Sequence, residues 1–283
     1  MKNNIQTFIA CDSSFEDARA VIFGAPFDGT TSFRPGTRFG PAAIRGESDG
    51  IETYSPYQDR DLEDIAVFDS GDLELPFGNT KIVLDMIEER TQEILDANKM
   101  PVMVGGEHLV TLGTVRALVK KYPDLHIIHF DAHTDLRDEY LGESLSHASV
   151  LRRCWDLVGD GRIHQFGIRS GERSEFEFAR NHTDIHPFDV EDVEDVVAGM
   201  DKNVPVYITL DLDVLDPSLF CGTGTPEAGG IFFPALENAL CSLRALNVVG
   251  FDMNELSPHY DASGVSTAVA CKVLREMLLA YIK

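Results

Sequence analysis

The sequence has 283 residues, 43% of them hydrophobic, and carries a formal net charge of -23 at pH 7. This length and hydrophobic content suffice to bury one large α/β core, and no apolar stretch approaches the roughly 20 residues of a membrane span. The negative charge argues against a nucleic-acid partner, whose phosphates would be repelled.

No basic start followed by an apolar run marks a secretory signal, so we expect a soluble, cytoplasmic protein. The cysteines lack the CxxC spacing of a zinc or redox site, which indicates reduced thiols. They are Cys11, Cys154, Cys221, Cys241 and Cys271. An acidic surface would concentrate a cationic substrate, although it also keeps a protein soluble without any role in binding.

Strand and helix patterns alternate along almost the whole chain. Apolar, β-rich runs predict strands at 20–24, 65–68, 101–104, 126–130, 163–168, 206–210 and 248–252. Helical periodicity is clearest at 80–98, 109–121, 234–246 and 263–281. The alternation predicts a mainly parallel sheet with helices on both faces, a three-layer α/β/α fold. Without repeats or linkers, we expect one domain covering residues 1–283.

A glycine-rich run at 36–41, Gly-Thr-Arg-Phe-Gly-Pro, lies between the first two predicted strands. It lacks the Lys-Ser/Thr ending of a phosphate-binding loop. The run therefore predicts a turn that leads into a helix, with Pro41 at the first helical position.

Three short polar runs each follow an apolar stretch. Their candidate metal ligands are His108, Asp131, His133, Asp135, Asp211 and Asp213. Side chains two positions apart on a strand share a face, roughly 6 to 7 Å apart along the chain. The carboxyl ends of parallel strands meet at one edge of the sheet, where ligands bind. A solvated acidic loop would explain one such run, but three at costly strand-end positions indicate a shared two-metal hydrolytic centre.

Four carboxylates and two imidazoles suit manganese better than a thiolate-seeking zinc. Two Mn²⁺ ions would balance the four negative charges. In such sites the ions lie about 3.5 to 4 Å apart and lower the pKa of a shared water, which yields hydroxide near neutral pH.

The motifs and their order resemble those of the ureohydrolases, the group that includes arginase and agmatinase. The matching runs are Gly-Gly-Glu-His at 105–108, Phe-Asp-Ala-His-Thr-Asp at 130–135, Leu-Asp-Leu-Asp at 210–213 with Leu-Asp-Pro at 215–217, and Gly-Thr-Gly-Thr-Pro at 222–226. The resemblance runs from about Phe23 to the C-terminus. It implies an arginase-like fold, a guanidinium substrate, and a homo-oligomer that is a trimer or hexamer.

The resemblance also implies metal-binding roles. His108, Asp131, Asp135 and Asp211 would hold the first ion, and Asp131, His133, Asp211 and Asp213 the second. Asp131 and Asp211 would then bridge the ions. Asp135 would accept a hydrogen bond from the bridging hydroxide that attacks the guanidinium carbon.

Three further residues match substrate and proton-transfer positions of the family. His147 matches the proton-shuttle histidine, although a lone loop histidine is often only solvated. Glu255 matches the acid that pairs with the guanidinium, which a carboxylate can grip with two hydrogen bonds. Thr225 would add a hydroxyl near the same group.

The stretch at 33–45 looks most like agmatinases within the family, which favours agmatine as the substrate. Arg137 stands where arginases have an Asn that grips the amino acid end of arginine. The distal amine of agmatine could instead be received by an acidic side chain. The candidates are Asp138, Glu139, Glu143 and Glu172, although a solvated acidic loop is the simpler role for most of them.

Two other readings stay open. A guanidinobutyrase or related guanidino-acid hydrolase would need a cation near the substrate tail, with Arg137 the candidate. A non-catalytic metal-binding paralogue would be expected to lose a ligand or the shuttle, and this sequence keeps both. Cys221 and Ala148 stand where many family members have proline and glycine, which leaves the shape of two loops open.

Overall fold

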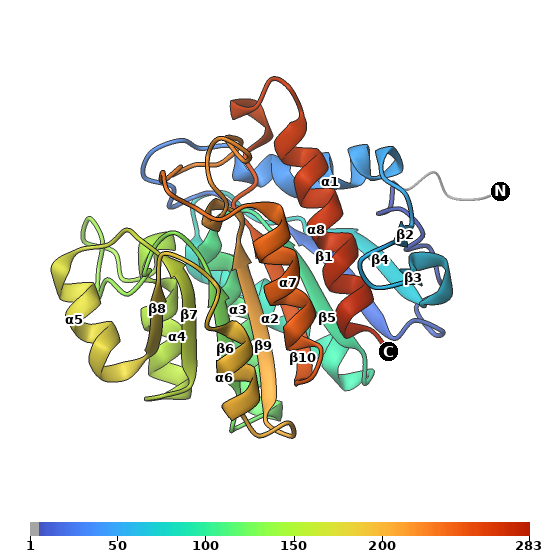
Figure 1. Cartoon of the computed structure of the whole chain (residues 1–283). Helices are drawn as coiled ribbons and strands as arrows, with labels where there is room; N and C mark the ends of the chain where they lie inside the picture. The colour runs from blue at the N-terminus through green and yellow to red at the C-terminus, as the bar shows by residue number, and fades with distance from the viewer. Residues whose placement is uncertain (1–5) are drawn as a thin grey trace.

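The computed structural model describes residues 6–283 and shows one large parallel sheet between two layers of helices (Figure 1). Its eight strands follow the order β4-β1-β5-β10-β9-β6-β7-β8. Each neighbouring pair is parallel. The predicted three-layer α/β/α fold is therefore confirmed. The domain predicted for residues 1–283 includes residues 1–5, which lie outside the described residues.

The strands of the sheet are β1 (Ala20–Ala25), β4 (Val67–Asp72), β5 (Met100–Gly105), β6 (His126–Phe130), β7 (Ile163–Ile168), β8 (Asp184–Pro187), β9 (Pro205–Asp211) and β10 (Asn247–Asn254). A separate antiparallel ribbon pairs β2 (Tyr54–Ser55) with β3 (Arg60–Asp61). The predicted strand at 65–68 begins later and extends to Asp72. The sequence pattern missed β8, because an edge strand that is only partly buried does not need an apolar run.

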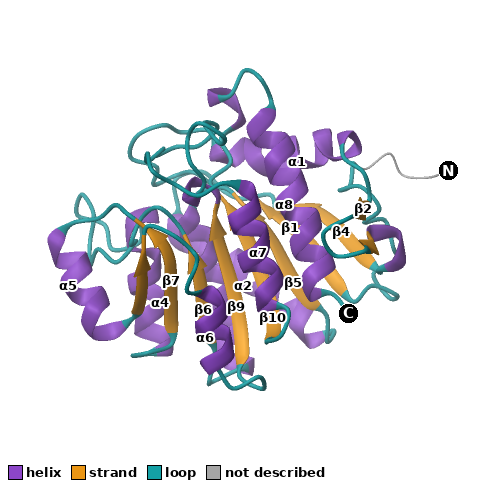
Figure 2. Cartoon of the chain, in the orientation of Figure 1, coloured by secondary structure: helices purple, strands orange, loops and turns teal. Residues whose placement is uncertain are grey.

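The helices are α1 (Gly40–Glu47), α2 (Thr80–Asp96), α3 (Thr111–Lys121), α4 (Val150–Val158), α5 (Arg173–His182), α6 (Val193–Gly199), α7 (Phe233–Leu243) and α8 (Val265–Tyr281). Helices α2, α3 and α4 pack in series on one face, and α1, α8, α7 and α6 on the other (Figure 2). The predicted helices correspond to α2, α3, α7 and α8. Pro41 lies at the second position of α1, one residue from its predicted place.

Within residues 6–283, no helix has both the length and the apolar character needed to cross a bilayer.

The strand order explains how distant motifs meet. Strands β5, β10, β9 and β6 are consecutive neighbours at the centre of the sheet, although they are far apart in the sequence. The metal-ligand runs follow β5, β6 and β9, so they emerge at the same carboxyl edge. Glu255 directly follows β10, which lies between β5 and β9.

Candidate metal and substrate site

The structure brings the six predicted metal ligands together at the carboxyl edge of the sheet. The His108 Nδ1 atom lies 3.1 Å from one oxygen of Asp131 and 3.1 Å from one of Asp135. The same nitrogen lies 3.6 Å from an oxygen of Asp211. These contacts gather the first predicted ligand set around one imidazole nitrogen.

The second predicted set meets around His133. Its Nδ1 atom lies 3.0 Å from Asp213 and 3.4 Å from Asp131. Ligand atoms of these three residues are close enough together to hold one ion. Asp131 thus faces both histidines, as a bridging ligand must. Asp211 meets this set through the Asp213 backbone N–H, which donates to it at 2.8 Å.

Local turns aim the carboxylates into the site. Asp131 accepts a hydrogen bond at 2.6 Å from the backbone N–H of His133, two residues later. The equivalent bond between Asp211 and the N–H of Asp213 forms at the end of β9. Asp135 follows with a φ of 53°, in the left-handed region that Asp tolerates better than most residues. The carboxylates of Asp131 and Asp211 are therefore oriented by the same local hydrogen bond.

The electrostatics of the cluster fit cations. Asp131, Asp211 and Asp213 are almost completely buried. Burial raises the pKa of Asp211 well above its usual range, and the charges of Asp213 and Asp131 raise it further. Burial and the Asp131 charge likewise raise the pKa of Asp135 to about 7. Bound cations would relieve this repulsion, and a donor set of four carboxylates and two imidazoles suits two divalent ions.

A row of buried polar side chains lies directly beneath the ligands. The row crosses four strands in register, with Asp252 beside Thr209, Thr209 beside His129 and His129 beside Gln165. Two of its members precede the ligands Asp131 and Asp211 by two residues, so they share a face with them. These four residues were not among the predicted site residues. The sequence signal that could have revealed them is the two-residue spacing within apolar strands, which places side chains on the same face.

Hydrogen bonds in this row determine which histidine nitrogens carry protons. The amide nitrogen of Gln165 donates to the Thr134 carbonyl and to Nδ1 of His129, so His129 donates from Nε2 to Asp131 at 2.9 Å. Thr209 donates to Asp252 at 2.7 Å and therefore accepts from Nε2 of His108 at 2.8 Å. When a cation replaces the second proton, this tautomer of His108 would present an unprotonated Nδ1 toward the carboxylates, the arrangement that a metal ligand requires.

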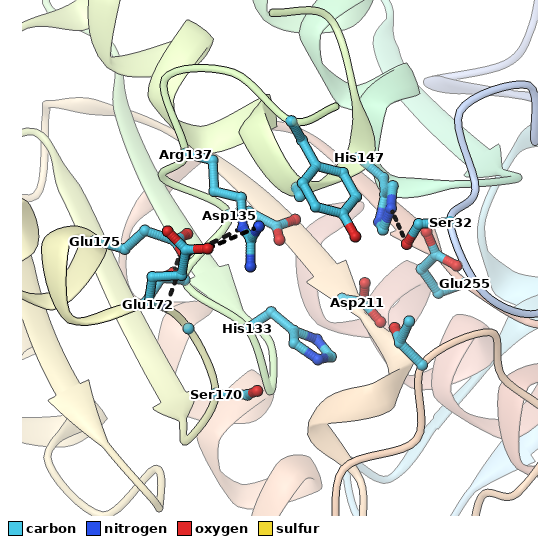
Figure 3. A pocket seen from close by; sticks show the side chains of 15 residues that line it. Ser32, His133, Asp135, Arg137, His147, Ser170, Glu172, Glu175, Asp211 and Glu255 are labelled. Atoms are coloured by element: carbon cyan, nitrogen blue, oxygen red, sulfur yellow. Dashed lines mark hydrogen bonds and ion pairs between the residues drawn. The ribbon is translucent and has the colours of Figure 1, made fainter. Parts of the chain in front are cut away.

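Three of the proposed ligands, His133, Asp135 and Asp211, line a cavity of about 290 Å³ (Figure 3). His147, Glu255 and Thr225 line the same cavity. One oxygen of Glu255 accepts the backbone N–H of His108 at 2.7 Å. Burial raises the pKa of Glu255 well above its usual range, and the nearby Glu107 adds to this effect. The Thr225 hydroxyl lies 3.3 Å from Asp213. All three residues named from the family resemblance thus face the metal-ligand cluster.

The opposite wall of the cavity is formed by Arg137 and its partners. The Arg137 guanidinium lies 3.1 Å from Glu172 and 3.4 Å from Glu175, and 4.5 Å from the centre of the Tyr140 ring. Glu175 is buried, whereas the Glu172 side chain is 58% exposed.

The four acidic candidates for binding the distal amine differ in their position relative to the cavity. Glu172 lines the cavity. Asp138 pairs instead with Arg153 at 2.8 Å. Glu139 and Glu143 are not among the described residues that line the cavity.

Comparison with known proteins agrees with this geometry. The model of the Arginase family matches residues 18–280. The chain is 49% identical to an agmatinase of Bacillus cereus over 98% of this chain and 97% of that protein. It is 35% identical to the mitochondrial guanidino acid hydrolase of Homo sapiens over 96% of this chain and 80% of that protein.

Solved structures show the same relationship. The crystal structure of agmatine ureohydrolase of Thermoplasma volcanium superposes with a TM-score of 0.88 at 34% identity, over 98% of this chain and 94% of that chain. The resemblance inferred from the metal-ligand motifs is therefore confirmed over nearly the whole sequence. This chain belongs to the arginase family and is a ureohydrolase.

Proposed function

We propose that this ureohydrolase cleaves agmatine to putrescine and urea, using two Mn²⁺ ions per subunit. The observation that carries the proposal is the charge of the cavity. Glu255 lies beside the metal ligands, while Glu172 and Glu175 at the opposite wall neutralise Arg137. A cavity with an acidic group at both ends suits a substrate that is positively charged at both ends, because a cation beside Glu255 favours its ionised form. The identity to an agmatinase supports the same substrate.

In this proposal the ligand sets keep the roles expected from the resemblance. His108, Asp131, Asp135 and Asp211 would hold one ion, and Asp131, His133, Asp211 and Asp213 the other. When bound, the ions would supply Lewis acidity and lower the pKa of water near neutral pH. Asp135 would accept a hydrogen bond from the nucleophile, because its carboxylate lines the cavity beside His133.

Glu255 would hold the guanidinium. Its buried carboxylate uses one oxygen for the His108 N–H. The cationic Arg137 lines the same cavity but pairs with Glu172 and Glu175 instead. A guanidinium would supply the missing charge and donate hydrogen bonds in a planar fork. Thr225 also lines the cavity and would add a hydroxyl.

His147 would protonate the departing amine, since collapse of the tetrahedral intermediate expels an amine only when a proton is supplied. The ring faces the cavity from the loop before α4 (Figure 3). Burial, with smaller contributions from the nearby imidazoles, lowers the pKa of His147 to about 4. The ring is therefore neutral near pH 7, and once protonated it would give up its proton readily.

The main alternative is hydrolysis of a guanidino acid such as 4-guanidinobutyrate. It requires a free cation for the substrate carboxylate, and Arg137 is already paired with two acids. Against a non-catalytic metal-binding role stands the position of His147, which lines the same cavity as the proposed ligands His133, Asp135 and Asp211. Urea release from agmatine, arginine and 4-guanidinobutyrate by manganese-loaded protein tests all three readings, and no urea from agmatine beside turnover of another compound would refute the substrate assignment.

The Glu172→Gln variant tests recognition of the distal amine. We expect the KM for agmatine to rise about two- to fivefold with little change in kcat, because an exposed charge pair contributes below roughly 1 kcal/mol. Hydrolysis of 4-guanidinobutyrate should improve, since Arg137 loses one of its acidic partners. The matched control is Glu177→Gln, an exposed acid outside the cavity on α5, the helix that Glu172 caps. Equal KM changes for both substrates would contradict this role.

We further propose that the chain acts as one catalytic unit, since strands from Ala20 to Asn254 join one sheet. The family resemblance supports a trimer or hexamer, which light scattering can measure. A reducing cytoplasm is compatible with the five unpaired cysteines.

A further inference from the structure

The loop between β1 and α1 forms part of the cavity rim, through Ser32. Asp28 closes the base of this loop: it accepts the backbone N–H of Gly36 at 2.8 Å and pairs with Arg38. Asp28 itself is buried. The segment between these contacts is therefore a closed loop with a fixed base.

Glu107 holds the middle of the same loop. Its carboxylate accepts the Thr30 hydroxyl at 2.7 Å, the Thr30 backbone N–H at 2.8 Å and the Thr31 hydroxyl at 3.2 Å. The Glu107 backbone N–H also donates to the Phe27 carbonyl at 2.7 Å. Glu107 is completely buried and directly precedes the metal ligand His108. The strand end that supplies His108 thus also holds the β1–α1 loop.

The loop in turn contacts His147 at two points. The Thr30 hydroxyl accepts the backbone N–H of His147 at 3.0 Å, and Ser32 Oγ lies 3.1 Å from Nε2 of its ring (Figure 3). Thr30 has a single hydroxyl proton, which it donates to Glu107, so its lone pair is free for His147. One hydroxyl therefore links a buried carboxylate to the backbone of the candidate proton donor.

We propose that Glu107 and Thr30 are positioning residues for His147, and that Ser32 orients its ring. The inference rests on the proposed function, in which His147 protonates the leaving amine. Proton transfer depends on reach within hydrogen-bond distance, and a displacement of about 1 Å can slow an enzyme roughly 100-fold. The hydrogen bonds from Glu107 through Thr30 thus hold His147 at a fixed distance from His108, the proposed metal ligand that follows Glu107.

The test compares two neighbouring threonines in the full-length, manganese-loaded protein. Thr30→Val removes the contact with Glu107 and the contact with His147, whereas Thr31→Val removes only a contact with Glu107. We expect Thr30→Val to lower kcat for agmatine about 10- to 100-fold, with KM and bound manganese unchanged. Thr31→Val should stay near wild type, and Thr30→Ser, which keeps the hydroxyl, should restore turnover.

A second measurement does not depend on turnover. Diethyl pyrocarbonate acylates accessible imidazole nitrogens, and mass spectrometry of the peptide containing His147 gives the rate at this residue. We expect faster acylation of His147 in Thr30→Val and in Ser32→Ala than in wild type. Ser32 is exposed, so its alanine variant tests the ring contact without a folding risk.

The outcomes separate the inference from the function on which it rests. Equal kcat and equal acylation in Thr30→Val and Thr31→Val would overturn the positioning role, as would manganese loss that accounts for the lower kcat. If Thr30→Val fails to fold, unchanged kcat and acylation in Ser32→Ala overturn it instead. Unchanged turnover in His147→Asn would refute the proposed proton transfer, while the acylation rates would still report whether the loop holds His147.

Discussion

Replacing Asp131 with asparagine is expected to remove manganese from the protein and abolish urea release. Asp131 faces both His108 and His133, so the substitution takes one negative charge from both proposed ligand sets. We expect metal affinity to fall by more than the roughly 10- to 100-fold typical of losing an outer hydrogen-bond partner of a ligand. Metal content after dialysis and the rise in Tm with added Mn²⁺ measure the effect, since a ligand stabilises only the state that binds it.

The control for this substitution is Asp184→Asn. Asp184 also contacts two histidines, His164 at 2.9 Å and His186 at 3.1 Å, but it lies on the edge strand β8. It should keep full metal content and full stabilisation by Mn²⁺. An Asp131→Asn protein that binds two ions per subunit as tightly as wild type would show that Asp131 is not a bridging ligand.

The His147→Asn variant should retain its manganese and its KM for agmatine, while kcat falls roughly 10²-fold or more if His147 is the general acid. Asparagine preserves a polar side chain of similar reach but cannot carry a proton at neutral pH. His147 is not one of the six proposed metal ligands and forms no hydrogen bond with them, so metal content should not change. Steady-state urea release together with metal analysis separates these two effects.

The comparison variant is His182→Asn, which alters a partly exposed histidine on α5 that pairs with Asp160 at 2.7 Å. It should leave kcat, KM and metal content near wild type. If His147→Asn turns over agmatine at the wild-type rate, proton delivery must come from another group. If it loses metal, His147 contributes to the metal site and its kcat says nothing about proton transfer.

The sequence alone predicted the fold class and most of its elements, because buried parallel strands require continuous apolar runs. It also predicted the six metal-ligand positions, since acids and histidines at the ends of apolar strands need cations or partners. Elements that lack a strong apolar pattern were harder to predict from the sequence. Strand β8 is half-exposed, and the limits of β4 are set by pairing with β1.

The buried residues beneath the metal ligands could not be predicted from the sequence for a different reason. His129, Gln165, Thr209 and Asp252 lie on separate strands and meet only because β10, β9, β6 and β7 are neighbours in the sheet. A period of two shows that residues share a face, but it does not show which strands are adjacent. The proton positions on His108 and His129 follow from these cross-strand contacts.

Arg137 illustrates what tertiary structure adds to the question of substrate. In the sequence it was a candidate cation for the tail of a guanidino acid, and its charge alone favoured that alternative. In the structure Glu172 and Glu175 approach it from the start of α5, beyond the next strand. The effect of a charge depends on its neighbours in space. Only the fold could therefore reveal that the charge of Arg137 is neutralised by these two acids.

The sequence by itself thus determined the family, because the motifs and their spacing match it, and it predicted the six metal ligands, because few side-chain types coordinate divalent ions. Tertiary structure decided how those residues are supported and which charges face the substrate. The contacts of Glu107 with Thr30, and of Thr30 with His147, join residues 77 and 117 positions apart. Such contacts depend on strand order and loop path, which local sequence patterns do not encode.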